Sequence, residues 1–268
     1  MEATDFRKFQ KIAYDIAGIE IRDGKESLVS ARVAKRMRVL GLDTHRQYLK
    51  FLDGGSNEDE LIEFLDVIST NFTNFYREKD HFEVLTRHLQ DLAGDGQRRF
   101  RIWCAAASSG EEPYTLALTV NEALSGISCD TRILATDIST RVLKRALHGV
   151  YPENTVAPVP AKQKHQYFEK RNIDGEKMFS MGPALRELLA FKRLNLNEVP
   201  YPMSGPFDAI FVRNVMIYFD DPMRQKVVHQ VERLLGPGGL LFIGHSETLS
   251  TVKTTLATER VSVYRKVT

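Results

Sequence analysis

The sequence has little cysteine and little excess charge of either sign. Of its 268 residues only Cys104 and Cys129 are cysteines, and neither lies in a Cys-x-x-Cys pair or near a pair of histidines. This pattern argues against a disulfide scaffold and against a structural zinc site, and we assign no metal. Lys and Arg number 37 and Asp and Glu 35, which gives a net charge of +2. That balance argues against a polybasic protein that coats nucleic acid.

Long hydrophobic runs are missing as well. The segment 1–8 is polar and of mixed charge, and no apolar stretch of the signal-peptide kind follows it. The longest apolar patches, such as 239–244, have the length of buried strands and fall short of the ~18 residues that a membrane span needs. We therefore expect a soluble, cytoplasmic protein without membrane insertion. Hydrophobic residues make up 43% of the chain, enough for a folded core.

The first 70 residues carry helical signals only. In the first helix, apolar side chains recur at three- and four-residue steps at Phe6, Phe9, Ile12, Ala13 and Ile16. A second helix is predicted over 27–40. Thr44, with Gln47 at the capping-box position, predicts the start of a third, and Asn57 followed by Glu60 predicts a fourth. Residues 1–70 are therefore predicted to form an all-helical N-terminal domain.

After about residue 95, strands alternate with helices. The predicted strands are 100–105, 132–137, 189–194, 207–212, 240–244 and 261–264, and the predicted helices are 113–124, 139–147 and 222–235. Such alternation predicts a mostly parallel, doubly wound α/β sheet. It is lost between residues 151 and 188, a stretch that contains four prolines. We expect a small antiparallel unit to be inserted there, within a domain that spans 95–268 and follows a linker and connecting helix over 71–94.

Two features fall at the carboxyl ends of predicted strands, where open parallel sheets bind ligands. The turn 105–110 contains only small residues, and the acids Glu111 and Glu112 follow it. These acids would repel a pyrophosphate and suit a positively charged ligand, and Asp137 ends the next strand, where it can accept both hydroxyls of a ribose. Together the features suggest S-adenosylmethionine. The alternative is that the alanines pack on the sheet and Asp137 caps the helix that begins at Ile138.

Longer motifs give a more specific resemblance. The stretches 103–114 (WCAAASSGEEPY), 135–138 (ATDI), 207–219 (FDAIFVRNVMIYF) and 244–247 (GHSE) resemble the CheR-type chemoreceptor glutamate methyltransferases. Residues 69–78 (STNFTNFYRE) resemble the interdomain linker of that family, and residues 31–38 (ARVAKRMR) resemble its basic second helix. The resemblance covers essentially the whole chain in the family's order.

The resemblance implies a Rossmann-like methyltransferase domain with a small antiparallel β-subdomain at about 151–188, preceded by the all-helical domain. It implies S-adenosylmethionine as cofactor and S-adenosylhomocysteine as product, held by Asn71, Thr73, Arg77, Glu112, Asp137, Asn195, Leu196, Arg213 and Asn214. The sequence departs from the family at Asn74, where a small residue is frequent, and at Val212, where a cysteine is common. Neither departure removes a polar contact.

The implied reaction moves a methyl group from a sulfonium to a glutamate carboxylate. This acceptor is ionised at neutral pH, so no general base is required. The site must remove water from the carboxylate and aim one oxygen at the methyl group. Tyr218 and Arg213 are the predicted catalytic donors. The alternatives are a core aromatic role for Tyr218 and an ion pair for Arg213, and His245 is expected to be a structural hydrogen-bonding residue.

The implied partners are the cytoplasmic helices of chemoreceptors. The basic residues of the second helix, Arg32, Lys35, Arg36 and Arg38, are the predicted docking site, with a merely solvated face as the alternative. Some family members also bind a C-terminal tether peptide of the receptor through the inserted subdomain, and this sequence leaves that open. The rival functions are methylation of nucleic acid or small molecules, and a module that senses S-adenosylmethionine or binds receptors without turnover. A monomer is the default expectation.

Overall fold

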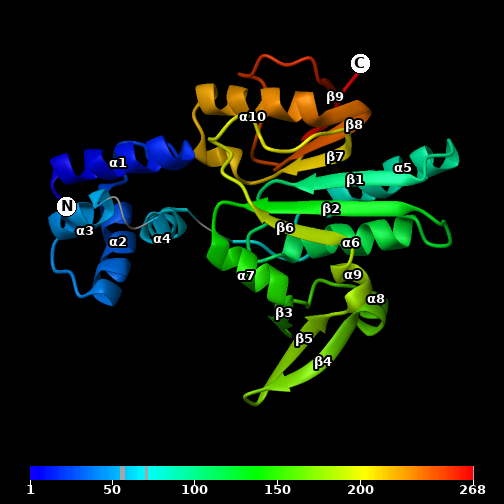
Figure 1. Ribbon diagram of the computed structural model, residues 1–268, viewed down its shortest axis with the longest axis horizontal. Helices are drawn as coiled ribbons and strands as arrows, with labels where there is room; N and C mark the ends of the chain where they lie inside the picture. Colours follow the sequence, from blue (N-terminus) through cyan, green and yellow to red (C-terminus); the bar gives the residue numbers. More distant parts are fainter. Residues whose placement is uncertain (55–57, 70–71, 268) are drawn as a thin grey trace.

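A computed structural model describes residues 1–54, 58–69 and 72–267 (Figure 1). Its N-terminal part contains the helices α1 (Ala3–Ala17), α2 (Glu26–Leu40), α3 (His45–Asp53) and α4 (Glu58–Ile68). The capping box predicted for α3 is confirmed, because Thr44 accepts a hydrogen bond from the backbone N–H of Gln47 and the Gln47 side chain accepts one from Thr44 in return. Asn57, the predicted cap of α4, lies outside the described residues.

The N-terminal helices bury the apolar stripe that the sequence predicted. Phe9 of α1 is fully buried and stacks on Phe64 of α4 with ring centroids 5.5 Å apart. Tyr48 of α3 lies edge-on to Phe64 and is buried as well. Aromatic contacts therefore hold three of these helices together.

The described part of the chain then forms a seven-stranded sheet in the order β6-β2-β1-β7-β8-β10-β9 (Figure 1). Its strands are β1 (Arg99–Cys104), β2 (Asp130–Asp137), β6 (Leu189–Arg193), β7 (Phe207–Val212), β8 (Leu235–Ile243), β9 (Ala257–Arg260) and β10 (Val263–Arg265). The pairs from β6 to β8 are parallel, whereas β10 is antiparallel to β8 and to β9. The predicted mostly parallel α/β sheet is confirmed.

Two details of this sheet differ from the sequence prediction. The segment predicted to end the preceding helix, 236–239, is the first half of β8, so the strand starts at Leu235 and not at residue 240. Glycine permits this, because a Cβ at Gly239 would lie 2.9 Å from the carbonyl oxygen of Phe207. The edge strand β9 was not predicted. Its residues are all exposed, so it lacks the alternating apolar pattern on which the strand prediction depends.

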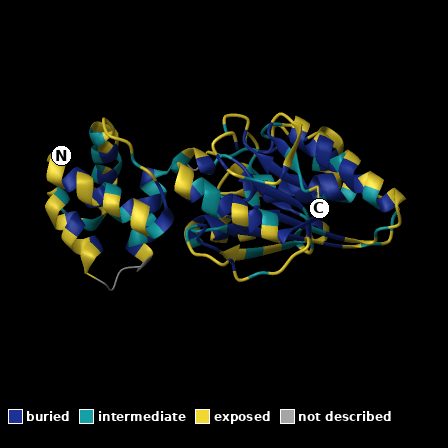
Figure 2. Ribbon diagram, turned by 90° about the horizontal axis from the view of Figure 1, so that it is seen from above, coloured by how far each residue is buried: buried dark blue, intermediate teal, exposed yellow. Residues whose placement is uncertain are grey.

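Helices cover both faces of the sheet: α5 (Asp80–Gly94), α6 (Glu111–Ala123), α7 (Thr140–His148) and α10 (Asp221–Leu234). Neighbouring residues of β7 point to opposite faces. Ile210 and Val212 enter a core with α10 and the N-terminal helices, whereas Phe211 enters a second core with α5 and α6. Figure 2 shows these interiors as buried ribbon between exposed helix faces. None of the helices described is both long and apolar enough to span a membrane.

The predicted insertion is confirmed. It consists of β3 (Val150–Pro152), α8 (Ala161–Tyr167), β4 (Phe168–Ile173), β5 (Glu176–Met181) and α9 (Pro183–Arg186), and it extends below the sheet in Figure 1. Its strands pair in antiparallel fashion in the order β3-β5-β4. Tyr151 and Phe168 pack edge-on against Phe75, which ties the insertion to the second core.

Candidate active site

A pocket of about 880 Å³, its open mouth included, lies where β1, β2, β6 and β7 end. The strand order reverses between β1 and β7, and such a reversal is where open α/β sheets bind ligands. The loops after these strands supply Ala105, Ala106, Ser108, Asp137, Ile138, Leu194, Asn195, Leu196, Arg213, Asn214 and Val215. Ala17 and Ile19, at and just after the end of α1, complete one wall, so the N-terminal helices take part in the site.

The structure brings the sequence-predicted site residues together. The pocket is lined by Thr73, Arg77, Glu112, Asp137, Asn195, Leu196, Arg213 and Asn214, all of them predicted cofactor residues, and by the predicted catalytic Tyr218. Asn71 lies outside the described residues. The placement agrees with a shared site, and the contact of each residue with the cofactor stays a prediction.

The small-residue turn after β1 is shaped for close approach. Gly110 adopts φ +101°, and a Cβ there would lie 2.6 Å from the hydroxyl of Tyr151 and 2.9 Å from Ala146, so only glycine fits. Ser108 lines the pocket with φ +46°. Its hydroxyl is buried without a hydrogen-bond partner among the described residues. A ligand in the pocket can satisfy that hydroxyl.

Asp137 ends β2 and faces the pocket. Its Oδ2 accepts a hydrogen bond of 2.8 Å from the backbone N–H of Ser108, and its Oδ1 accepts one of 3.0 Å from that of Ser139. Burial raises the pKa of Asp137 to about 6, and these backbone donors oppose the rise. The Ser139 hydroxyl caps α7 by accepting from the N–H of Val142. The alternative in which Asp137 caps a helix that begins at Ile138 is therefore wrong, because α7 begins at Thr140 and Ser139 is its cap. Asp137 orients Ser139 and lines the pocket.

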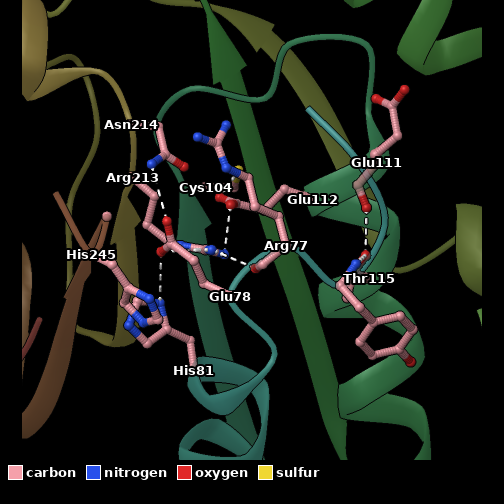
Figure 3. Close-up of polar contacts among 12 residues, drawn as sticks. Arg77, Glu78, His81, Cys104, Glu111, Glu112, Thr115, Arg213, Asn214 and His245 are labelled. Carbon is pink, nitrogen blue, oxygen red and sulfur yellow. Dashed lines mark hydrogen bonds and ion pairs between the residues drawn. The ribbon is translucent and has the colours of Figure 1, made fainter. Parts of the chain in front are cut away.

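A buried ion-pair network forms another wall of the pocket (Figure 3). The side chain of Arg213 is 0% exposed. It donates from Nη2 to Glu78 at 3.0 Å and to the carbonyl of Arg77 at 2.5 Å, and from Nη1 to Glu112 at 2.8 Å. The guanidinium also lies 5.4 Å from the centre of the Phe82 ring. The structure thus favours the ion-pair interpretation of Arg213, and its role as a catalytic donor stays a prediction.

The two carboxylates of this network have opposite pKa shifts. Burial raises the pKa of Glu112, although Arg213 opposes the rise, and Glu112 also accepts a hydrogen bond of 3.2 Å from the Cys104 thiol. Burial acts in the same sense on Glu78, but Arg213 and Asn214 outweigh it and lower the pKa of Glu78. Glu78 was not predicted as a site residue. The signal that was available is its position at the end of the linker motif, directly after Arg77.

Glu247 shapes the turn that carries Tyr218, and this role was also missed. Its Oε2 accepts from the backbone N–H of Asn214 at 2.9 Å, and its Oε1 accepts from that of Ile217 at 3.1 Å. Burial raises the pKa of Glu247, and these backbone donors oppose it. Ile217 belongs to the short 3₁₀ helix η1 (Met216–Tyr218), so Glu247 holds this helix next to Asn214. The GHSE motif therefore serves to position the Arg213–Tyr218 segment.

Asn195 joins the sheet to the N-terminal helices. It is buried, and its Nδ2 donates to the carbonyl of Ile16 at 2.7 Å and to Glu198 at 3.0 Å. The neighbouring Asn197 donates to the carbonyl of Asp15 at 3.1 Å. These contacts fix the α1 wall of the pocket against the loop that follows β6.

The basic face predicted on α2 is only partly open. Arg36 donates from Nε to Glu60 at 2.7 Å and from Nη2 at 2.5 Å, with Glu63 at 3.8 Å. Arg32 donates to the backbone carbonyl of Ile68. Arg32, Lys35, Arg36 and Arg38 were predicted as an exposed docking site. Arg36 and Arg32 instead fasten α2 to α4, because acids and a helix end lie within their reach. Lys35 and Arg38 are exposed.

Family models match nearly all of the chain. Residues 71–265 match "CheR methyltransferase, SAM binding domain", and residues 4–69 match "CheR methyltransferase, all-alpha domain". The boundary between the two matches falls between α4 and α5. The pocket described above thus draws its wall from both matched segments.

Curated relatives agree with these matches. The chain is 37% identical over 259 residues to the chemotaxis protein methyltransferase of Salmonella typhimurium, which covers 97% of this chain and 88% of that protein. It is 39% identical to chemotaxis protein methyltransferase 2 of Pseudomonas aeruginosa, over 91% of this chain and 86% of that one. A solved S-adenosylmethionine dependent methyltransferase from Mesorhizobium loti is 16% identical over 55% of this chain and 46% of that one, with a TM-score of 0.32. This structural similarity is slight.

Proposed function

The chain belongs to the CheR methyltransferase family, and from this premise we propose that it methylates glutamate side chains of chemoreceptors. It is an S-adenosylmethionine-dependent methyltransferase of chemotaxis. The finer proposal is that the acceptor is a glutamate carboxylate and the product a methyl ester. The observation that carries it is the pocket at the carboxyl ends of the parallel strands, which contains Asp137, Glu112 and Tyr218 together.

The residues present fit the cofactor. The turn at Ala105 and Ala106 leaves room for close approach, and the buried Ser108 hydroxyl lacks a partner among the described residues. Asp137 offers carboxylate oxygens to the ribose hydroxyls. When bound, S-adenosylmethionine supplies a methyl group on a positively charged sulfonium. The carboxylates of Glu112 and Asp137 make the pocket wall suitable for that charge.

The chain's own residues then have to orient the acceptor. A glutamate side chain is ionised at neutral pH, so no residue is required to remove a proton from it. The Tyr218 hydroxyl donates a hydrogen bond to the acceptor carboxylate or orients the methyl donor. Glu247 holds the turn that carries Tyr218, and the α1 wall limits the access of water. Arg213 neutralises Glu78 and Glu112 and keeps both carboxylates in place.

The proposal extends to the partner surface. Receptor methylation segments are glutamate-bearing helices, and the exposed cations Lys35 and Arg38 of α2 attract such a helix. Arg32 and Arg36 shape the same face through their contacts with α4. We place this activity in the cytoplasm, where those receptor segments lie, and take the monomer as the working unit.

The insertion gives a second contact with the receptor. In the described three-stranded sheet β4 is an edge strand, and an extended peptide can add to such an edge through backbone hydrogen bonds. We propose a C-terminal tether peptide of the receptor as that strand. A receptor that lacks its C-terminal peptide should then be methylated more slowly at limiting concentration, and equal rates would contradict this contact.

The deciding experiment is transfer of tritiated methyl from labelled S-adenosylmethionine to receptor-enriched membranes. Base-labile label on the receptor, as expected of an ester, supports the proposal. Label on nucleic acid or on a small molecule would support the rival methyltransferases. A nucleic-acid methyltransferase would also show an affinity for RNA that falls steeply as salt rises. Cofactor binding without any transfer would indicate a sensor or adaptor.

A further inference from the structure

Two histidines gather beside Glu78 of the ion-pair network, and the proposed methyl transfer uses neither of them (Figure 3). Glu78 lies in the turn before α5, His81 lies in the first turn of α5, and His245 follows β8. One ligand atom from each of these residues lies within 4.8 Å of the other two. The sequence offered no metal-site spacing here, because only the tertiary fold brings His245 to α5.

His81 is the unusual member of the cluster. Its side chain is 0% exposed, yet neither of its ring nitrogens has a hydrogen-bond partner among the described residues. Its Nδ1 lies 3.6 Å from Glu78 Oε2, beyond hydrogen-bond distance. Its ring is edge-on to that of His245, with centroids 4.8 Å apart, and to that of Phe242. A buried polar group without a hydrogen-bond partner lowers the stability of the fold, so a bound ligand at this imidazole would be stabilising.

The surroundings suit a cation. Glu78 and Glu112 pair with Arg213, and Asp80 lies beside His245, so carboxylates stand on two sides of the cluster. Asp80 lies 3.2 Å from Nε2 of His245, a carboxylate–imidazole contact of the kind that orients metal-binding histidines. Glu78 accepts from Arg213 at Oε2 and from Asn214 at Oε1, so a metal ion would share these oxygens with those donors.

We propose that Glu78, His81 and His245 form a binding site for a divalent transition-metal ion of the Zn²⁺ class. Imidazoles with one carboxylate select Zn²⁺, Cu²⁺ or Ni²⁺ over Mg²⁺ and Ca²⁺, which prefer oxygen ligands. Three protein ligands leave one coordination position for water. Ligand atoms around tetrahedral zinc are roughly 3.3 Å apart. The side chains must therefore close somewhat around the ion, and His245, which is 44% exposed, has the freedom to do so.

The test is a titration of the purified full chain with Zn²⁺ against a chromogenic chelator, and with Co²⁺ followed by its d–d absorption. We expect one equivalent of Zn²⁺, a four-coordinate cobalt spectrum and a rise in melting temperature on adding Zn²⁺. His245→Ala should weaken the affinity at least ~10-fold and abolish the melting shift, because it removes one of three ligands. Mg²⁺ should have no effect.

Matched controls keep this outcome decisive. His165→Ala removes an exposed histidine elsewhere on the chain and should leave Zn²⁺ binding unchanged. His81→Phe keeps an aromatic ring beside Phe242 and should also abolish binding; if it fails to fold, the His245→Ala variant still decides. Zn²⁺ binding that is equal in wild type, His245→Ala and His165→Ala would overturn the proposal. A cobalt spectrum without four-coordinate character would overturn it too. Neither result bears on methyl transfer.

Discussion

Arg213 and Arg36 each lie between two glutamates, in different regions of the molecule. Arg213 joins Glu78 and Glu112 at the pocket and is fully buried. Arg36 joins Glu60 and Glu63 between α2 and α4, with 22% of its side chain exposed. Both arginines bring together elements that are distant in sequence. Only the first, however, has a carboxylate partner, Glu112, that lines the pocket.

The difference between these clusters lies in the solvent access of the arginine, which is 0% exposed at Arg213 and 22% at Arg36. Removing one partner of a dry ion pair leaves a charge that water cannot reach, whereas a pair at the surface is screened. The cluster at Arg213 therefore links the pocket wall to folding stability. The cluster at Arg36 fastens α2 to α4.

The largest effect should come from removing the buried arginine. Arg213→Gln leaves Glu78 and Glu112 unneutralised and should lower the free energy of unfolding by about 3–5 kcal/mol. Arg36→Gln should cost less, because the Arg36 side chain itself is 22% exposed and water can partly replace it, although its partner Glu60 is only 6% exposed. Urea unfolding monitored by circular dichroism measures both. Equal losses would break the contrast.

The next effect concerns turnover and not folding. Tyr218 lies five residues after the buried Arg213, and its side chain is partly exposed and lines the pocket. Tyr218→Phe deletes only the hydroxyl, so kcat should fall on the order of 10- to 1,000-fold. Steady-state kinetics with receptor membranes measures it, with cofactor affinity and melting temperature as controls. Wild-type turnover would make Tyr218 a core aromatic, and lost cofactor affinity with normal turnover at saturation would make it a binding residue.

Asp137 provides a buried carboxylate without the arginine. Asp137→Asn keeps the shape but weakens the acceptor of the ribose hydroxyls, so S-adenosylhomocysteine should bind roughly tenfold or more weakly, a loss of ~1–3 kcal/mol. Folding should lose about 1 kcal/mol, because the amide can accept only one of the two backbone N–H bonds that the carboxylate accepts. Calorimetry measures the affinity. Unchanged affinity would leave Asp137 only the role of orienting Ser139.

The same residue predicts a dependence on pH. The pKa of Asp137 is raised to about 6 in the folded chain, above the usual value for aspartate. The folded state thus binds the extra proton as pH falls from about 6 towards 4, and this contribution to stability is lost as pH rises through 6. Ribose hydroxyls donate hydrogen bonds, so they bind best to the ionised carboxylate of Asp137. Affinity for S-adenosylhomocysteine should therefore decline below pH 6 in wild type and stay flatter in Asp137→Asn, as a calorimetric pH series would show; parallel profiles would contradict the assignment.

The smallest effect is expected at the docking face. Lys35→Glu combined with Arg38→Glu should reduce receptor methylation a few-fold, and more at low salt than at high salt. Cofactor binding should be untouched. Arg36→Gln is the matched control, since that cation is already held by Glu60. No loss at limiting receptor would show that the face is merely solvated.

The sequence was sufficient for the features that depend on local pattern. Strand ends and small-residue turns predicted Asp137 and the loop after β1, and the motif around Arg213 placed it in the same pocket. The missed features are tertiary. Glu78 and Glu247 act through contacts with residues far along the chain, which no spacing reveals. Arg36 looked solvated because the sequence does not show Glu60 opposite it.

The antiparallel bridge between Ile19 and Phe219 has a consequence for how the chain unfolds. Ile19 belongs to the segment matched by the all-alpha family model and Phe219 to the other, yet both enter one apolar core. The backbone N–H of Glu20 also donates to the carbonyl of Tyr218 at 2.8 Å. The two matched segments thus share an interior and cannot open independently there. Binding of S-adenosylhomocysteine should therefore slow amide hydrogen exchange near the end of α1 and at the strand ends together. Limited proteolysis should likewise detect one cooperative unit at this junction.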